Sequence, residues 1–138
     1  MKTFLDTNVL VYAVDTTDPA KNAKAVSIVQ DALVNRRAYA ISTQTLSEFA
    51  NVALGKLGLA PDAVLDFLRV FRGLDAVLPD LELVRRGVEL KALHGIHFYD
   101  AMMVAAAERA GAAEFWTEDL NAGQRYAGIL VRNPFAEG

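Results

Sequence analysis

The amino-acid sequence predicts an α/β fold in which a short-stranded, mainly parallel central sheet is flanked by helices. Short apolar segments, typical of buried strands, alternate with longer segments whose apolar residues recur at helical spacing. Ser, Asp, Pro and Gly residues separate these segments, as expected where helices begin and end. The chain has 138 residues without a repeat, a low-complexity tract or a long linker, which predicts one domain over residues 1–138.

The first predicted strand, Lys2–Leu5, is followed by a short helix over Asn8–Val14. Asp18 is a suitable N-cap for the next helix, because Pro19 fits the first helical position. This helix is predicted to extend to about Arg37. Its inward face is predicted to carry Ala23, Val26, Val29, Leu33 and Val34.

The second predicted strand, Ala38–Ser42, leads into a helix that Ser42 or Thr43 caps. This helix is expected to end between Gly55 and Gly58, and another runs from Pro61 to Gly73. The residues predicted to face inward are Leu46, Phe49, Ala50 and Ala53 on the first helix, and Val64, Leu65, Leu68 and Phe71 on the second.

Three strands and two helices are predicted in the rest of the chain. In order, these are the strand Ala76–Leu78, the helix Pro79–Leu93, the helix Phe98–Ala110, and the strands Glu114–Thr117 and Ile129–Val131. Residues from Asn133 onward are predicted to form a flexible tail. In parallel sheets, ligands bind outside the carboxyl ends of the strands. Candidate functional residues are therefore polar residues that follow a strand or begin a helix.

Composition and charge restrict the classes of function. The net charge of −3 argues against a protein that coats nucleic acid electrostatically, but it is compatible with a nuclease whose acids bind cations. Without cysteine, a metal must be held by oxygen or by His94 or His97. Asp6 interrupts any signal-peptide apolar region, and no apolar run approaches the roughly 20 residues that cross a bilayer. We expect a cytoplasmic protein that does not contact membranes.

Four acidic residues are assigned to one edge of the sheet by separate local patterns. Asp6 and Asp119 each follow a predicted strand. Asp100 lies in the first turn of a helix, where the helix dipole favours a carboxylate, and Glu48 lies near the start of the helix after the second strand. Each has an ordinary alternative as a turn residue or a solvated helix residue, so the combination carries the prediction.

Carboxylates gathered in one place suit hard divalent cations such as Mg²⁺ or Mn²⁺, which prefer oxygen ligands. Without cations, the carboxylates would repel one another. Two such cations about 4 Å apart can activate a water and stabilise the leaving oxygen in phosphodiester cleavage. The acids therefore predict a metal-dependent phosphodiesterase.

Four segments around these acids resemble, in order, the motifs of PIN-domain ribonucleases. They are Phe4–Leu10 around Asp6, Thr45–Phe49 around Glu48, Phe98–Ala107 around Asp100, and Trp116–Leu120 around Asp119. Their order, spacing and total length are similar to those of VapC toxins from prokaryotic toxin–antitoxin pairs. The resemblance covers nearly the whole chain.

This resemblance implies a three-layer α/β/α PIN-like fold and an endoribonuclease that acts on single-stranded or structured RNA. It implies Mg²⁺ or Mn²⁺ in the acidic pocket, a homodimer, and a VapB-like antitoxin that blocks the pocket. The implied site consists of Asp6, Glu48 and Asp100 as core ligands, Asp119 as the supplementary acid, and Asn8 and Thr117 as polar supports. Glu118 is adjacent, but Asp119 matches the motif.

Other functions agree less well with the sequence. A haloacid-dehalogenase-type phosphatase would need an Asp where Asn8 stands, and a receiver-like phosphoacceptor would need a lysine later than Lys91. A non-catalytic RNA- or protein-binding module with a PIN-like fold remains the alternative, which the repulsive acid cluster disfavours. His94 and His97 are expected to be loop residues or RNA contacts. The arginines at positions 36, 37, 69, 72, 85 and 86 are candidate phosphate contacts.

Overall fold

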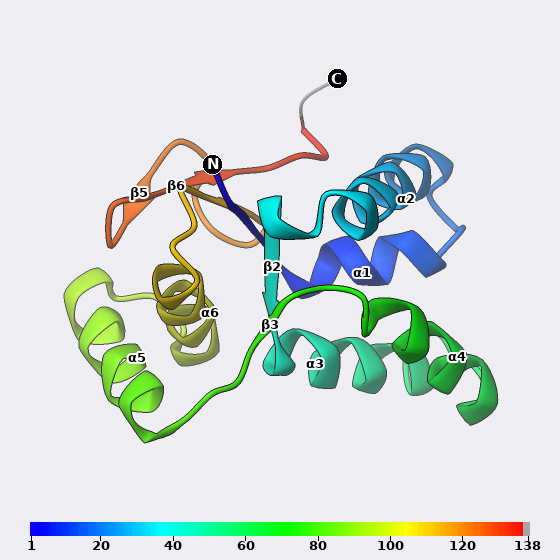
Figure 1. The fold of residues 1–138 in the computed structure, drawn as a ribbon, viewed down its shortest axis with the longest axis horizontal. Helices are drawn as coiled ribbons and strands as arrows, with labels where there is room; N and C mark the ends of the chain where they lie inside the picture. Colours follow the sequence, from blue (N-terminus) through cyan, green and yellow to red (C-terminus); the bar gives the residue numbers. More distant parts are fainter. Residues whose placement is uncertain (137–138) are drawn as a thin grey trace.

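A six-stranded sheet forms the centre of the computed structural model, which describes residues 1–136 (Figure 1). The strand order is β3-β2-β1-β4-β6-β5, and all neighbouring strands are parallel except β5 and β6. The strands are β1 (Thr3–Leu5), β2 (Tyr39–Ser42), β3 (Ala76–Val77), β4 (Glu114–Trp116), β5 (Arg125–Tyr126) and β6 (Ile129–Arg132). The predicted domain boundary at Gly138 lies outside the described residues.

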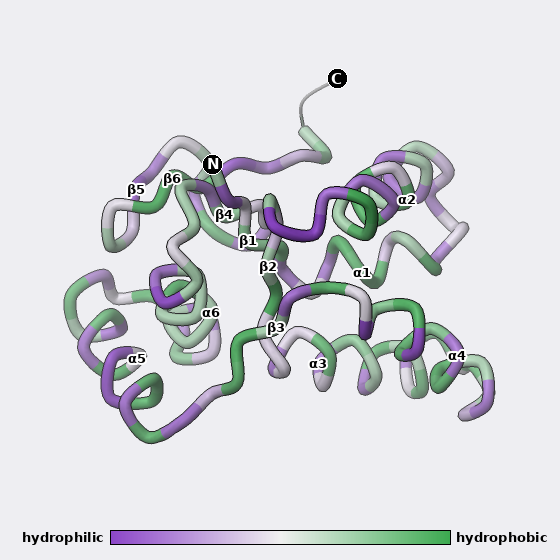
Figure 2. Tube along the Cα trace, in the orientation of Figure 1, coloured by the Kyte–Doolittle hydropathy of each residue, from purple (hydrophilic) through white to green (hydrophobic). Residues whose placement is uncertain are grey.

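Helices cover both faces of this sheet, which confirms the predicted three-layer α/β/α fold (Figure 1). The helices are α1 (Thr7–Val14), α2 (Pro19–Val34), α3 (Thr43–Leu54), α4 (Pro61–Phe71), α5 (Leu81–His94) and α6 (Phe98–Arg109). The outer helices α4 and α5 alternate between hydrophilic and hydrophobic residues (Figure 2). No helix in the described part of the chain is long and apolar enough to span a membrane.

The side chains of each strand alternate between the two faces of the sheet, so the hydrophobic core has two parts. Phe4 and Ala40 pack with α5 and α6, whereas Leu5 and Ile41 pack with α1 to α4. Successive side chains of a strand point to opposite faces, so these buried residues serve both layers. Apolar residues on both sides of the central strands are expected for a sheet buried on both faces.

Side-chain caps begin α2 and α3 where the sequence predicts them. The Asp18 carboxylate accepts a hydrogen bond from the backbone N–H of Lys21 at 3.2 Å, with Pro19 as the first helical residue. Of the two candidate caps for α3, Ser42 accepts from the backbone N–H of Gln44 at 3.1 Å. These caps satisfy N–H groups that have no partner inside the helix.

The helix α2 departs from the prediction in its end and in its inward face. It ends at Val34, and the backbone N–H of Asn35 bonds the Asp31 carbonyl at 2.7 Å before a 3₁₀ turn over Arg36–Ala38. Val34 is 81% exposed and Ala23 is also exposed. The buried residues are Ala25, Ile28, Val29 and Ala32. Alanine and valine occur all around this helix, so its sequence defined the buried face poorly.

Further differences occur where elements are short or peripheral. On α4, the predicted inward residues Val64 and Phe71 are buried, but Leu65 is 52% exposed. The antiparallel strand β5 was missed because its two residues, Arg125–Tyr126, are too few to show alternation. In the predicted flexible tail, the Phe135 ring packs edge-on against Tyr12, with the ring centroids 4.9 Å apart.

Candidate active site

The four predicted acids lie at the carboxyl edge of the sheet on four separate segments. Asp6 directly follows β1 and caps α1, and Asp119 follows β4, which pairs with β1 in parallel. Glu48 lies in the second turn of α3, and Asp100 lies in the first turn of α6. Because β2, β1 and β4 are adjacent parallel strands, the segments that follow them begin at the same edge.

Asp6 is the most buried of these acids, with 5% of its surface exposed. One carboxylate oxygen accepts from the backbone N–H of Thr7 at 2.7 Å, and the other accepts from the Thr117 hydroxyl at 2.5 Å. Burial raises the pKa of Asp6 to about 7, although both hydrogen bonds favour the charged form. The negative charges of Asp119 and Glu48 raise this pKa further.

The pKa of Asp100, which is half-buried, is also raised. Burial is the largest cause of this increase, and the charges of Asp119 and Glu48 add to it. The charge of His97 acts in the opposite direction and lowers the pKa. Glu48 and Asp119 therefore act electrostatically on both Asp6 and Asp100. Within residues 1–136, no lysine or arginine forms a salt bridge with any of the four acids.

The raised pKa of Asp6 predicts an unusual dependence of stability on pH. Between about pH 4 and pH 7, the folded protein holds the Asp6 proton while the unfolded chain releases it. The contribution of this proton to the free energy of unfolding is complete below about pH 4 and is lost as the pH rises to about 7. In chelator, the Tm of the wild type should therefore fall relative to that of Asp6→Asn as the pH rises across this window.

Thermal unfolding of both proteins over the same series of buffers measures this difference. The variant is a suitable reference because asparagine has nearly the same shape and does not titrate. Parallel curves for the two proteins would contradict the raised pKa of Asp6.

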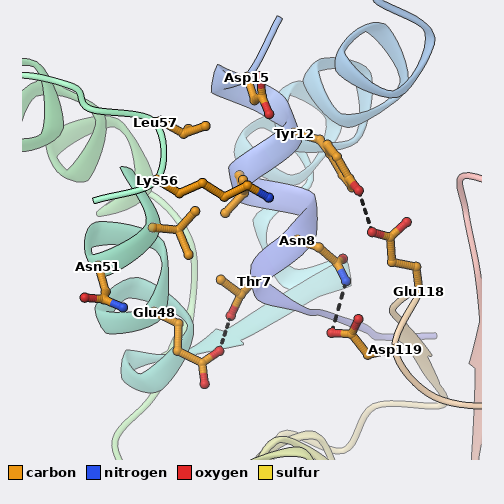
Figure 3. Close-up of a pocket in the computed structure, with 12 residues that line it drawn as sticks. Thr7, Asn8, Tyr12, Asp15, Glu48, Asn51, Lys56, Leu57, Glu118 and Asp119 are labelled. Atoms are coloured by element: carbon orange, nitrogen blue, oxygen red, sulfur yellow. Dashed lines mark hydrogen bonds between the residues drawn. The ribbon is translucent and has the colours of Figure 1, made fainter. Parts of the chain in front are cut away.

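Neutral side chains donate hydrogen bonds to the carboxylates of Glu48 and Asp119 (Figure 3). The Thr7 hydroxyl donates to Glu48 Oε2 at 2.7 Å, and the Asn8 amide donates to Asp119 Oδ2 at 3.4 Å. As placed, no three His, Asp or Glu side chains of the described chain form a metal-binding cluster. Glu48 and Asp119 lie on the wall of an open cleft.

Gln44 is a functional candidate that the sequence analysis did not identify. Its Nε2 donates to Glu48 Oε1 at 2.9 Å and to the backbone carbonyl of Tyr99 at 3.2 Å. Because Tyr99 precedes Asp100, this amide ties the Glu48 side chain on α3 to the start of α6. Its position four residues before Glu48, on the same helical face, is the sequence signal that could have identified it.

The two predicted polar supports contact the acids directly. Thr117 is fully buried, and its hydroxyl donates to Asp6 while accepting from the backbone N–H of Asp119 at 3.0 Å. Asn8 donates to Asp119, but its carbonyl oxygen Oδ1 is buried without a partner among the described residues. Four carboxylates and an unpaired oxygen form a donor set that fits a hard divalent cation with bound water.

Glu118 and the two histidines are engaged elsewhere. Glu118 accepts from the Tyr12 hydroxyl at 2.5 Å (Figure 3). It also accepts from the Lys21 ammonium at 3.1 Å. His97 caps α6, its Nδ1 accepting from the backbone N–H of Tyr99 at 3.3 Å. His94 ends α5 and packs its ring against Tyr126, at a centroid distance of 5.0 Å.

A cleft of about 390 Å³ runs between α1 and α3 (Figure 3). Glu48 and Asp119 line one end of it, and Lys56 and Leu57, from the segment between α3 and α4, line the other. The carboxylates of Glu48 and Asp119 can therefore be reached from solvent along this cleft.

The fold and the order of these segments define a class of protein. The family model for the PIN domain matches residues 3–127. The chain therefore belongs to the PIN-domain family. A comparison with curated proteins finds no match.

Solved structures share this fold at low sequence identity. DNA-bound VapBC from Salmonella typhimurium is 22% identical, with a TM-score of 0.71 over 97% of this chain and 98% of that chain. The toxin VapC20 of Mycobacterium tuberculosis, which cleaves the sarcin–ricin loop, is 16% identical, with a TM-score of 0.68 over 94% and 99%. VapBC2 of Rickettsia felis, bound to a promoter DNA fragment, is 18% identical, with a TM-score of 0.68 over 96% and 98%.

Proposed function

We propose that this chain is a VapC-like toxin, an Mg²⁺- or Mn²⁺-dependent endoribonuclease that a VapB-like antitoxin neutralises. The observation that carries the proposal is the gathering of four carboxylates at the carboxyl edge of the sheet, where burial, together with their mutual repulsion, raises the pKa values of Asp6 and Asp100. A fold gains no stability from such repulsion, so the arrangement suits cation binding.

The metal would be held by Asp6, Glu48, Asp100 and Asp119. When bound, it would lower the pKa of a water molecule and offset the negative charge of the reacting phosphate. Hydrogen bonds within the chain position these carboxylates. The Thr117 hydroxyl bonds Asp6 and the backbone N–H of Asp119, and the Gln44 amide bonds Glu48. The unpaired Oδ1 of Asn8 is an acceptor suited to orienting a water molecule.

The comparisons support the assignment of substrate and partner. A structural neighbour cleaves the sarcin–ricin loop, and two others are VapBC complexes. We propose by analogy that RNA is the substrate, that the antitoxin covers the acidic cleft, and that the toxin is a homodimer.

The ends of the RNA products test this mechanism. The water oxygen bonds to phosphorus, and the bond from phosphorus to the 3′ oxygen breaks. We therefore expect 5′-phosphate and 3′-hydroxyl ends, which ligation-based sequencing of the fragments with and without phosphatase treatment can identify. A chelator should stop the reaction, and added Mg²⁺ or Mn²⁺ should restore it. Ends with 2′,3′-cyclic phosphate would contradict the proposal, because they arise from attack by the ribose 2′-hydroxyl.

A further inference from the structure

We infer that the cleft between α1 and α3 binds the RNA strand next to the cleaved phosphodiester, and that Lys56 binds a backbone phosphate there. This inference rests on the proposed ribonuclease function and extends it to a second contact with the substrate. Lys56 lies in the segment after α3, and its side chain extends across the cleft toward α1 (Figure 3).

The ammonium group of Lys56 is available for a ligand. Lys56 is exposed, and within the described part of the chain it forms no salt bridge. Asp15 also lines the cleft, and the charge of Lys56 contributes to the lowered pKa of its carboxyl, after two hydrogen bonds from Thr17. Those bonds, 3.1 Å from the Thr17 N–H and 2.8 Å from its hydroxyl, hold one Asp15 oxygen on its own loop.

The charge distribution of the cleft makes this lysine important for a polyanion. Glu48, Asp119, Glu118 and Asp15 all contribute carboxylates to the lining. The Glu118 carboxylate is 3.1 Å from the Lys21 ammonium, and the proposed metal would offset Glu48 and Asp119. Lys56 is the basic side chain in the lining of this cleft, so it supplies the attraction that an RNA phosphate needs there.

The rest of the lining suits a nucleotide. Val11, Val52 and Leu57 give the cleft an apolar wall, and Asn51 adds a polar side chain. Such a surface can contact a base or a ribose while the ammonium contacts the phosphate.

The arginines that the sequence suggested as phosphate contacts are outside this cleft. Several of them form ion pairs instead. Arg36 pairs with Asp75, Arg69 with Asp66, Arg85 with Glu82, and Arg86 with Glu108.

Fluorescence anisotropy with the full-length protein tests this inference. The probe is a short fluorescein-labelled single-stranded RNA of mixed sequence, with Ca²⁺ replacing Mg²⁺. We expect Lys56→Gln to weaken binding about threefold to tenfold, and Lys56→Arg to retain the affinity. The slope of log affinity against log salt should become shallower by about 0.7 for Lys56→Gln, the value for one lost phosphate contact on a single strand. In cleavage assays, KM should rise while kcat changes little.

Lys24→Gln is the matched control, because Lys24 is an exposed lysine on α2 outside the cleft. Equal RNA affinity for Lys56→Gln and the wild type would overturn the inference. An equal loss in Lys24→Gln would also overturn it, because the effect would then be one of total charge. Unchanged RNA affinity with weakened antitoxin binding would assign the cleft to a protein segment instead. A wild type that neither binds nor cleaves RNA would overturn the proposed function as well.

Discussion

Replacing Asp100 with asparagine is expected to abolish RNA cleavage while leaving the fold intact. Asp100 is half-buried in the first turn of α6, and its pKa is raised by burial and by the charges of Asp119 and Glu48. Asparagine keeps the shape but removes the charge that would bind the metal. Mutating a residue that hydrogen-bonds a metal ligand typically lowers metal affinity or activity about 10- to 100-fold. Loss of a ligand itself should therefore reduce the cleavage rate by more than about 100-fold.

The same substitution should barely change the Tm of the metal-free protein. It removes a favourable charge from a helix N-terminus, but it also relieves repulsion between carboxylates. Asp62→Asn is the matched control, because Asp62 is an exposed acid in the first turn of α4. Sequencing of RNA 5′ ends in cells that express each variant would identify the target. Cleavage by Asp100→Asn at the wild-type rate would exclude Asp100 from the proposed site.

The positions of the acids were predictable because each depends on local sequence. Asp6 and Asp119 follow strands, and the parallel sheet brings strand ends together. The contacts that organise these acids were not predictable in the same way. The Gln44 amide contacts the backbone of Tyr99, which is 55 positions away in the chain, and the Thr117 hydroxyl contacts Asp6 across 111 positions. Such contacts exist only after the sheet and helices have packed.

The same reasoning explains the errors in the predicted elements. The buried face of α2 was assigned only in part, with Val29 correct but Ala23 and Val34 wrong, because small apolar residues occur on all sides of the helix and packing against α1 selects the face. Lys56 was not identified because nothing in its local sequence distinguishes it from other surface lysines. Its significance comes from the acidic cleft that α1, α3 and the segment after β4 form around it.

Adding Mg²⁺ or Mn²⁺ to the metal-free protein is expected to raise the Tm, and Asp6→Asn should abolish this increase. A ligand at about 100 times its Kd contributes about 2.7 kcal/mol to stability, which corresponds to roughly 5–10 °C for a domain of this size. Asp6 should contribute strongly to this metal-induced increase in Tm. Burial raises its pKa to about 7, and a bound cation would stabilise the charged form that burial disfavours.

Protons and metal should therefore compete for Asp6, and the metal-induced increase in Tm should be larger at about pH 8 than at about pH 6. Thermal unfolding with and without metal measures both effects, and Asp62→Asn should respond like the wild type. Asp6→Asn should start from a higher metal-free Tm at the alkaline end, since it carries no buried charge, and should then gain little from metal. An equal gain in the variant would mean that the metal binds elsewhere. No gain in the wild type would favour a non-catalytic binding module, because the repulsion among the four acids would then persist without a cation to relieve it.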